Sequence, residues 1–288
     1  MTQKRDYTKI TPVSVSGEDR FILWQSESTT NVPQLLGVNH PEQRELSFLR
    51  GRFPLLSISI LNNRLLTLDT GGNISIRSTE SLSSPASSAR ADFTFSSVGA
   101  IDSSIINNEY IVVSRSVISN NSPFIYVNIR TSETVSVPYP ARAGLNVFSG
   151  SNGIFAQAVE QDNNGIKTTV LSLPPVSSSG ARTAAAVRIF EYRGEASHLS
   201  IAESGGSIAV ACDSEGALIF ADNTVVMERT NGLPVKLLGY ERFFICLDSE
   251  GNISWHDNRT GRILAVFSLN GNRWNLSGSN VVSGEFLP

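Results

Sequence analysis

A short unit recurs along this chain: an apolar run, a polar turn that ends in glycine, and a second apolar run. The stretch IAVACDSEG (208–216) returns 35 positions later as FFICLDSEG (243–251). The run FFICL is too short for a helix and too continuously apolar for a strand with one face in water, so it predicts a strand buried on both faces. This repeat constrains the fold more than any other feature of the sequence.

The residues around this run predict a β-meander. Asp248–Gly251 and Asn258–Gly261 both have the composition of a turn with glycine in the left-handed position. The segment between them alternates in polarity, as a strand does. One unit therefore has four strands, which are PVKLLGY (234–240), FFICL (243–247), NISWHD (252–257) and RILAVF (262–267).

The same unit can be followed through the whole chain. A polar or glycine pair precedes each apolar strand, and the copies start at steps of 44, 45, 44, 54 and 35 residues. Short strands at this spacing predict an all-β fold, a β-propeller of six to seven four-stranded blades. A tandem β-sandwich is the alternative, because Greek-key chains also have regular turns. The six strands are GEDRFILW (17–24), NNRLLTL (62–68), NNEYIVV (107–113), SNGIFAQAV (151–159), GGSIAVAC (205–212) and YERFFICL (240–247).

The chain length and the two ends suggest how such a ring is organised. With 288 residues, 40% of them hydrophobic, residues 1–288 are expected to form a single propeller domain. The Ser/Ala-rich stretch 78–92 falls inside a unit and is expected to be a long, mobile surface loop. The ends, 7–17 and 275–288, each carry a lone strand. Because proteins avoid unpaired edge strands, the N- and C-terminal strands are expected to pair and close the ring.

Charge and hydropathy limit the classes of partner. The chain has 23 basic and 26 acidic groups, a formal charge of −3, which gives no general attraction to nucleic acid or anionic lipid. The polar N-terminus lacks the apolar core of a signal peptide, and no run approaches the about 18 apolar residues that cross a bilayer. We expect no nucleic-acid partner, no direct membrane insertion and a cytoplasmic location, or a periplasmic one if a leader has been removed.

The two cysteines occupy related places in the repeat. Cys212 and Cys246 each lie within an apolar run, one position apart in register. They could form a redox pair or half of a metal site. The preferred interpretation is that both are reduced, buried and dispensable for binding, since free cysteine is among the most buried residue types and no C-x-x-C is present.

The segment DSEGNISWHDNRTGR (248–262) resembles the repeat of quinoprotein-type (PQQ-like) propellers, a class akin to WD40-like repeats. DTGGNISIRSTES (69–81) keeps only the first half of that pattern, and Phe267 stands in for its closing aromatic residue. The resemblance implies either a quinone-dependent dehydrogenase or a cofactor-free scaffold of the outer-membrane assembly type. The dehydrogenases are larger and have adjacent cysteines, so a scaffold is expected. The residues on the pattern are Asp248, Gly251, Asp257, Thr260, Gly261 and Arg262.

Motifs that carry chemistry are absent from the sequence. It contains no phosphate-binding glycine loop, no H-E-x-x-H and no G-x-S-x-G. A zinc site would require His40, His198 and His256 to converge in the fold. The acidic turns at Asp213, Asp248 and 161–165 could be halves of calcium loops, but hairpin turns are preferred because Asp and Asn bond their own backbone. We expect no catalytic residue, no cofactor and no metal site, and therefore no enzyme.

Binding is the remaining class of function. A non-catalytic scaffold that mediates protein–protein interactions within a larger assembly is expected. The alternatives are an exported scaffold whose leader is missing and an enzyme with its site in a central channel. Aromatic, arginine and histidine residues in turns mark the weak candidates for contact with a protein partner. These candidates are Tyr139 and Arg142 in VPYPARAG (137–144), Tyr192 and Arg193 in FEYRGEASH (190–198), and His256 and Arg259 beside Trp255.

Overall fold

β-Strands are the main secondary structure of the computed structural model, which describes the chain except for short gaps and the two ends. Its described helical residues form two short 3-10 helices, η1 (Ser47–Leu49) and η2 (Thr79–Leu82). No helix in the described ranges is long and apolar enough to span a membrane. The described ranges are 9–37, 43–49, 51–83, 90–116, 122–141, 143–150, 153–163, 165–176, 184–194, 199–212, 216–220, 223–240, 242–268 and 273–276.

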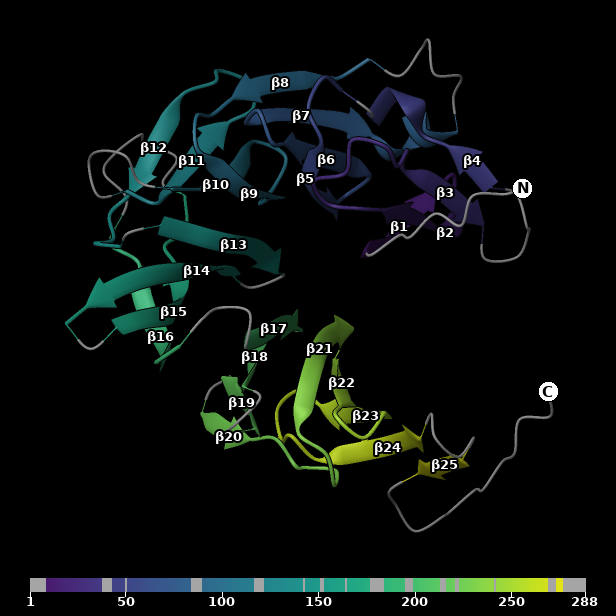
Figure 1. Cartoon of the computed structure of the whole chain (residues 1–288), viewed down its shortest axis with the longest axis vertical. Coiled ribbons are helices and arrows are strands. Elements are labelled where there is room, and N and C mark those ends of the chain that lie inside the picture. The colour runs from purple at the N-terminus through teal and green to yellow at the C-terminus, as the bar shows by residue number, and fades with distance from the viewer. Residues whose placement is uncertain are drawn as a thin grey trace. The chain divides into compact units, whose positions relative to one another are not determined.

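The described strands form six antiparallel sheets that follow one another along the chain (Figure 1). In each sheet the strands lie in the order in which the chain makes them; five sheets have four strands, and the last has five. Such an up-and-down meander is the blade of a β-propeller. The prediction of an all-β propeller with six to seven blades is confirmed, with six sheets in the part of the chain that the structure describes.

Contacts between residues divide the chain into two compact units. Strands β1–β12 and most of β13–β16 belong to unit 1, and β17–β25 belong to unit 2. The expectation that residues 1–288 form a single domain stays a prediction. Unit 1 comprises Met1–Ser149, Ile154–Asp162 and Thr169–Phe190, and unit 2 comprises Gly150–Gly153, Asn163–Thr168 and Glu191–Pro288.

The first three sheets lie wholly in unit 1. The first is made of β1 (Lys9–Val15), β2 (Glu18–Trp24), β3 (Gln34–Gly37) and β4 (Gln43–Glu45). The second is made of β5 (Leu55–Leu61), β6 (Arg64–Asp69), β7 (Asn73–Ser78) and β8 (Phe93–Ser96). The third is made of β9 (Ala100–Ile105), β10 (Tyr110–Arg115), β11 (Phe124–Asn128) and β12 (Thr134–Val137).

The other three sheets complete the described chain. The fourth is made of β13 (Ala143–Gly150), β14 (Gly153–Asp162), β15 (Gly165–Leu173) and β16 (Val187–Tyr192). The fifth is made of β17 (Leu199–Ser204), β18 (Ser207–Cys212), β19 (Gly216–Phe220) and β20 (Thr224–Val226). The sixth is made of β21 (Pro234–Tyr240), β22 (Phe243–Asp248), β23 (Asn252–Asp257), β24 (Ile263–Ser268) and β25 (Arg273–Leu276).

The six apolar strands expected from the repeat are the second strands of the six sheets: β2, β6, β10, β14, β18 and β22. A second strand has a hydrogen-bonded neighbour on both sides, and neighbouring sheets can cover both of its faces. In β10, for example, Ile111, Val112, Val113 and Ser114 are all buried. In β10 the continuous apolar run thus reflects burial on both faces. In β22, the strand for which this was predicted, one face is buried and the other, with Phe243, Ile245 and Leu247, is half-buried.

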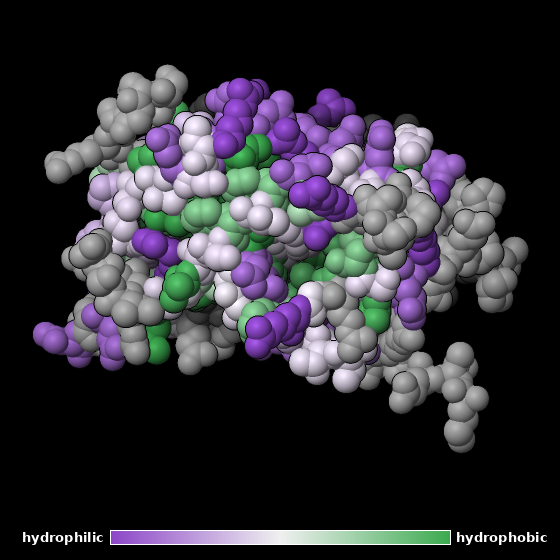
Figure 2. Space-filling view, turned by 90° about the horizontal axis from the view of Figure 1, so that it is seen from above, coloured by the Kyte–Doolittle hydropathy of each residue, from purple (hydrophilic) through white to green (hydrophobic). Residues whose placement is uncertain are grey.

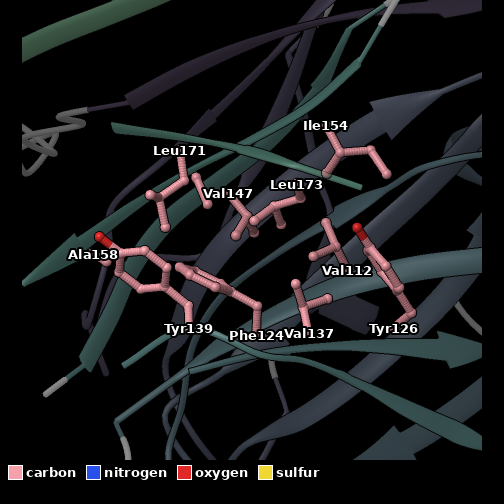
Figure 3. Packing of buried hydrophobic residues seen from close by; sticks show 11 residues of the cluster. Val112, Phe124, Tyr126, Val137, Tyr139, Val147, Ile154, Ala158, Leu171 and Leu173 are labelled. Atoms are coloured by element: carbon pink, nitrogen blue, oxygen red, sulfur yellow. The ribbon is translucent and has the colours of Figure 1, made fainter. Parts of the chain in front are cut away.

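Four apolar clusters hold neighbouring sheets together within the units. Three lie in unit 1, between the first and second sheets, the second and third, and the third and fourth. Figure 3 shows the last of these, in which the rings of Phe124, Tyr126 and Tyr139 pack with aliphatic side chains such as Leu171 and Leu173. The fourth cluster lies in unit 2, between the fifth and sixth sheets, and includes Phe244.

First strands of neighbouring sheets are also joined by polar side chains. In unit 1 the Asp102 carboxylate on β9 accepts a 2.9 Å hydrogen bond from the backbone N–H of Val147 on β13. In unit 2 the Ser200 hydroxyl on β17 accepts a 2.9 Å bond from the backbone N–H of Leu237 on β21. These bonds satisfy backbone groups at a sheet edge that strand pairing leaves open.

The expected pairing of the two chain ends is not seen among the described strands. The strand β1 pairs with β2, and β25 pairs with β24, each within its own meander. Most of the predicted C-terminal strand, residues 277–288, lies outside the described residues, so the closure of the ring stays a prediction. The start of the 78–92 stretch is not a surface loop, because Thr79 and Leu82 in η2 are buried. Leu82 packs in the cluster between the first two sheets.

Candidate binding cleft

His256 and Arg259, the first predicted pair of binding residues, lie in very different surroundings. His256 on β23 is 1% exposed, whereas Arg259 is exposed in the turn that follows. The buried face of β23 carries Ser254 and His256, and Ile253 and Trp255 on the other face are half-buried. The alternation of β23 is as predicted, but the face that carries Ser254 and His256 is the buried one. His256 is therefore not an exposed contact residue, and its hydrogen bonds lie within the sixth sheet and the turn after β23.

Ser254 and His256 form a hydrogen-bonded pair of the kind that activates a serine nucleophile. The Nδ1 atom of His256 lies 3.2 Å from the carbonyl oxygen of Gly261, so Nδ1 carries the hydrogen. The Nε2 atom then accepts from the Ser254 hydroxyl at 2.7 Å. Both side chains are buried, and the cavity beside them measures only about 10 Å³. The pair therefore acts as a structural tie within β23 and to the turn that follows it.

This tie makes a specific prediction about pH. Burial lowers the pKa of His256, although the Gly261 carbonyl and Glu228 both raise it. The folded protein thus holds the neutral ring, while an unfolded histidine titrates near 6.5. As the pH falls from about 7 toward 5, the unfolded state binds a proton that the folded state resists, so stability falls. We expect His256→Gln to flatten this part of the curve, measured as urea midpoints from pH 8 to pH 5; parallel curves would contradict the assignment.

Tyr139 is not the exposed contact residue that its proline-flanked sequence suggests. It is 8% exposed and packs in the cluster between the third and fourth sheets (Figure 3). Its hydroxyl donates to the carboxylate of Glu160, which Thr169 also contacts at 3.1 Å. Burial and this hydrogen bond raise the pKa of Tyr139. Arg142, its predicted companion, lies outside the described residues.

Tyr192 and Arg193 end the β16 strand and begin the connection beyond it. Arg193 is exposed, and Tyr192 is half-buried. Gly194 has a φ of +155°, and a Cβ there would lie 2.5 Å from the Tyr192 ring. The ring thus lies directly on this glycine. Their role in binding stays a prediction.

The prediction that Cys246 is buried is confirmed, while the dispensability of the two cysteines for binding stays a prediction. Cys246 is a free, buried thiol in the cluster between the fifth and sixth sheets. Burial and the charge of Asp248 raise the pKa of its thiol to about 11. A protonated thiol in this place is a poor nucleophile. The Cys212 side chain lies outside what the structure describes.

The acidic turn at Asp248 is a hairpin turn, as preferred, and so is the related turn at Asp69, whereas Asp213 lies outside the described residues. Asp69 Oδ1 accepts backbone N–H bonds from Gly71 and Asn73, each at 2.9 Å. Asp248 Oδ1 accepts from Glu250 at 2.9 Å and Asn252 at 2.8 Å in the same way. The second oxygen of Asp248 accepts from Thr230 at 2.5 Å and from the Asn252 amide at 2.8 Å. These hydrogen bonds occupy lone pairs of the carboxylate oxygens, so Asp69 and Asp248 stabilise their own turns.

A different candidate site lies on the second sheet, whose two faces differ in polarity. One face of β6, β7 and β8 carries Leu66, Leu68, Ile74 and Ile76 in the cluster with the third sheet. The other face of the same strands is polar. Its cross-strand neighbours are Thr67, Ser75 and Thr94 in one row and Asn73 and Ser96 in the next.

This polar face forms the floor of a cleft in unit 1. The segment 48–55, which joins the first sheet to the second, forms the opposite wall with Phe48, Arg52 and Phe53. The cleft measures about 570 Å³, within the range of about 300–1,000 Å³ usual for ligand pockets. A smaller hollow of about 120 Å³ lies against the same segment and is lined by Gln25, Ser28 and Asn31. We call the larger hollow the Arg77 cleft, after the charged residue on its floor.

Two arginines line the Arg77 cleft, each beside an aromatic ring. The guanidinium carbon of Arg77 lies 5.9 Å from the centre of the Phe48 ring, and that of Arg52 lies 5.5 Å from the Phe53 ring. Such cation–π contacts orient a guanidinium group over the ring. Phe53 itself lies on Gly71, where a Cβ would come within 2.5 Å of the ring. The turn glycine thus fixes the wall of the cleft.

The electrostatics of the cleft favour an anion. Burial lowers the pKa of Arg77, and the charge of Asp92 raises it. Arg77 donates to the hydroxyl of Ser75, a neutral partner. Asp69, the acidic residue of the lining, has its Oδ1 bonded to backbone N–H groups and to the Asn73 amide at 3.0 Å. The cleft therefore presents two cationic groups and a row of hydroxyls.

The sequence carries a faint signal for this cleft. GRFPLL (51–56) places an arginine and an aromatic residue between a glycine and a proline, as VPYPARAG does. NISIRS (73–78) alternates, which predicts that Ser75 and Arg77 share a face. Hydropathy alone is no guide, because hydrophilic residues interrupt the hydrophobic ones on the face that Figure 2 shows. Which loop covers which face of a sheet depends on the tertiary fold and not on local sequence.

Comparison with known proteins supports the fold. The crystal structure of the computationally designed Ika8 protein matches with a TM-score of 0.55 at 8% identity, over 99% of this chain and 98% of that chain. The WD40 domain of Neurospora crassa Pan2 matches with a TM-score of 0.57 at 11% identity, over 92% and 84%. No protein-family model and no curated protein matches the sequence. The chain is a β-propeller repeat protein, and at these identities the likeness concerns the fold alone.

Proposed function

We propose that this protein is a non-catalytic scaffold that binds another protein through the Arg77 cleft and so takes part in a larger assembly. One observation carries the proposal: an open cleft of about 570 Å³ whose walls combine arginines, aromatic rings and hydroxyls. Arginine and aromatic residues are the types enriched at the energetic centres of protein interfaces. The propeller fold and its WD40 neighbour are consistent with such a role.

The nature of the cleft favours binding over catalysis. Its floor is made of threonine, serine and asparagine side chains, and its two cationic groups are guanidinium groups, which cannot act as bases. The carboxylate of Asp69 in the lining is bonded to the N–H groups of its own turn. The Ser254–His256 pair has the right chemistry for a nucleophile, but it is buried beside a cavity of only about 10 Å³. Substrate could not reach it. We accordingly propose no enzymatic activity.

Two narrower points of the proposal rest on the sequence. The quinoprotein-type repeat in residues 248–262 points to a scaffold of the kind found in cofactor-free propellers. The location proposed for the scaffold is the cytoplasm, with a periplasmic scaffold as the alternative. A start codon upstream that adds a signal peptide or a lipobox would decide for export.

Affinity capture with matched surface variants tests the proposal. The tagged full-length chain, Arg52→Glu and Arg259→Glu are each used to capture proteins from the source cells, followed by quantitative mass spectrometry. Both arginines are exposed, so neither change disturbs a core. Arg259 is one of the contact candidates from the sequence, so the comparison also decides between that turn and the Arg77 cleft as the place of contact. We expect a partner that the wild-type chain and R259E capture equally and that R52E captures at no more than a tenth of that level. Capture of no protein above the level of a tag control would overturn the proposal.

A further inference from the structure

The chemistry of the Arg77 cleft is specific enough to indicate what part of a partner enters it. Arg77 comes from β7 on the floor, and Arg52 comes from the 48–55 segment that forms the wall. Within the described residues, Arg52 has no ion pair with a carboxylate, and its guanidinium group lies over the Phe53 ring. Phe53 is 39% exposed, so this corner of the cleft is open to solvent. A ligand can therefore reach both guanidinium groups.

The acidic residue in the cleft does not compete for these cations. Asp69 Oδ1 accepts two backbone N–H bonds, and both of its oxygens lie 3.0 Å from the Asn73 amide. This carboxylate is therefore committed to the turn between β6 and β7. Guanidinium groups bind carboxylate and phosphate oxygens through paired N–H donors. The row of hydroxyls from Thr67, Ser75 and Thr94 adds further donors along the floor.

The edge of the second sheet favours an extended peptide over an isolated small molecule. β8 is the outermost strand of this sheet in the part of the chain that the structure describes. Thr94 and Ser96 on β8 line the cleft, so the cleft opens beside a strand edge. An extended segment can lie along such an edge while one side chain enters a neighbouring pocket. Phe48 and Phe53 provide apolar surface on either side of that pocket for flanking residues.

We propose that the Arg77 cleft binds an extended peptide segment of the partner through a side-chain oxyanion, which is the carboxylate of glutamate or aspartate or the phosphate of a phosphorylated residue. Arg52 and Arg77 hold the oxyanion, the hydroxyls of Ser75 and Thr94 complete its hydrogen bonds, and Phe48 and Phe53 contact its neighbours. This inference rests on the proposed function and names the chemical class of the partner at the same site.

Defined peptides test the inference directly. Four fluorescein-labelled nonapeptides differ only at the central residue, which is glutamate, phosphoserine, glutamine or lysine. Their other residues are neutral and identical, with leucine beside the central position. Each is titrated into the full-length protein and followed by fluorescence anisotropy. We expect the glutamate or the phosphoserine peptide to bind at least tenfold more tightly than the glutamine peptide, and the lysine peptide to bind most weakly. The two anionic arms distinguish carboxylate from phosphate, and inorganic phosphate alone serves as a competitor.

Variants place the binding in the cleft. Arg52→Glu is expected to weaken the anionic peptide roughly ten- to hundredfold, because it removes hydrogen bonds to a charged group. Arg259→Glu makes the same charge change in an exposed turn of unit 2 and should leave the affinity unchanged. Arg77→Gln should also weaken binding, and circular dichroism with the urea midpoint shows whether that variant is folded. If R77Q does not fold, the comparison of R52E with the wild-type protein still decides the test.

Two outcomes overturn the inference. One is equal affinity for the glutamate, phosphoserine and glutamine peptides, and the other is equal loss of affinity in R52E and R259E. Failure here is separable from failure of the scaffold role. If affinity capture yields a partner that R52E still retains, the scaffold role stands and the oxyanion inference is wrong. If no partner is captured at all, the scaffold role itself is wrong.

Discussion

Replacing Phe244 with alanine is expected to destabilise unit 2 by about 3–5 kcal/mol, because truncation of a buried phenylalanine removes apolar contacts and leaves a cavity. Phe244 lies on β22 and is 0% exposed. It packs in the cluster between the fifth and sixth sheets, which otherwise consists largely of small residues such as Ala209 and Ala211. Small neighbours cannot move in to fill the space. Equilibrium unfolding in urea measures the change.

The preceding residue provides a matched control. Phe243 is on the opposite face of the same strand and is only half-buried, with Arg242 over its ring at 5.3 Å. Phe243→Ala removes the same atoms from the same strand and should cost less than half as much. Equal loss of stability in both variants would show that the fifth sheet does not pack on the sixth through the face that carries Phe244.

The second large effect is expected where two first strands approach each other. A Cβ added at Gly239 on β21 would lie 1.6 Å from the carbonyl oxygen of Glu203 on β17 and 2.6 Å from its carbonyl carbon. Since the obstacle is backbone, no side-chain rotation can relieve it, and the strands must separate. We expect Gly239→Ala to destabilise the protein by about 3 kcal/mol, the upper part of the range for overpacking. Hydrogen exchange should show faster exchange in β17 and β21.

Gly51 is the control for that change. A Cβ there would meet its nearest neighbour, Asp69, at 3.9 Å, an ordinary contact distance. Gly51→Ala should therefore leave the urea midpoint nearly unchanged. A midpoint for G239A that equals the G51A value would show that β17 and β21 do not lie as closely as described.

Much of the fold could be predicted because its signals are local. A strand with both faces covered must be apolar at every position, so the runs that became β2, β6, β10, β14, β18 and β22 are visible in the sequence. The turns are equally local. Gly251 has a φ of +80° and Gly261 a φ of +68°, values that favour glycine, and the flanking aspartates bond the turn's own N–H groups.

The features that could not be predicted depend on which surfaces meet. Tyr139 has the composition of an exposed turn, yet its ring completes an apolar cluster and its hydroxyl finds Glu160 from a distant strand. His256 has the alternation of a wet face, but the fifth sheet covers that face with the cluster around Phe244. The same holds for η2, whose serine-rich sequence hides a buried Leu82. The sequence gives the polarity of each side chain, whereas tertiary packing determines whether that side chain is exposed.

The candidate site was missed for the same reason. Arg52 and Arg77 are far apart in sequence and share no motif, and only the path of the 48–55 segment brings both to one cleft. Of the predicted binding residues, Arg193 and Arg259 are exposed, Tyr192 is half-buried, Tyr139 and His256 are buried, and Arg142 lies outside the described ranges.

Site-specific photo-crosslinking tests the central claim most directly, the claim that a partner protein enters the Arg77 cleft. The photoreactive residue p-benzoylphenylalanine replaces Thr94, which lines the cleft, and in a second protein it replaces Thr134 on β12; both positions are exposed. After irradiation in cells, mass spectrometry identifies any attached protein. We expect a partner to be attached at position 94, through a segment that carries an acidic or phosphorylated residue, and not at position 134. Equal attachment at both positions, or none at position 94 with a captured partner present, would contradict the account.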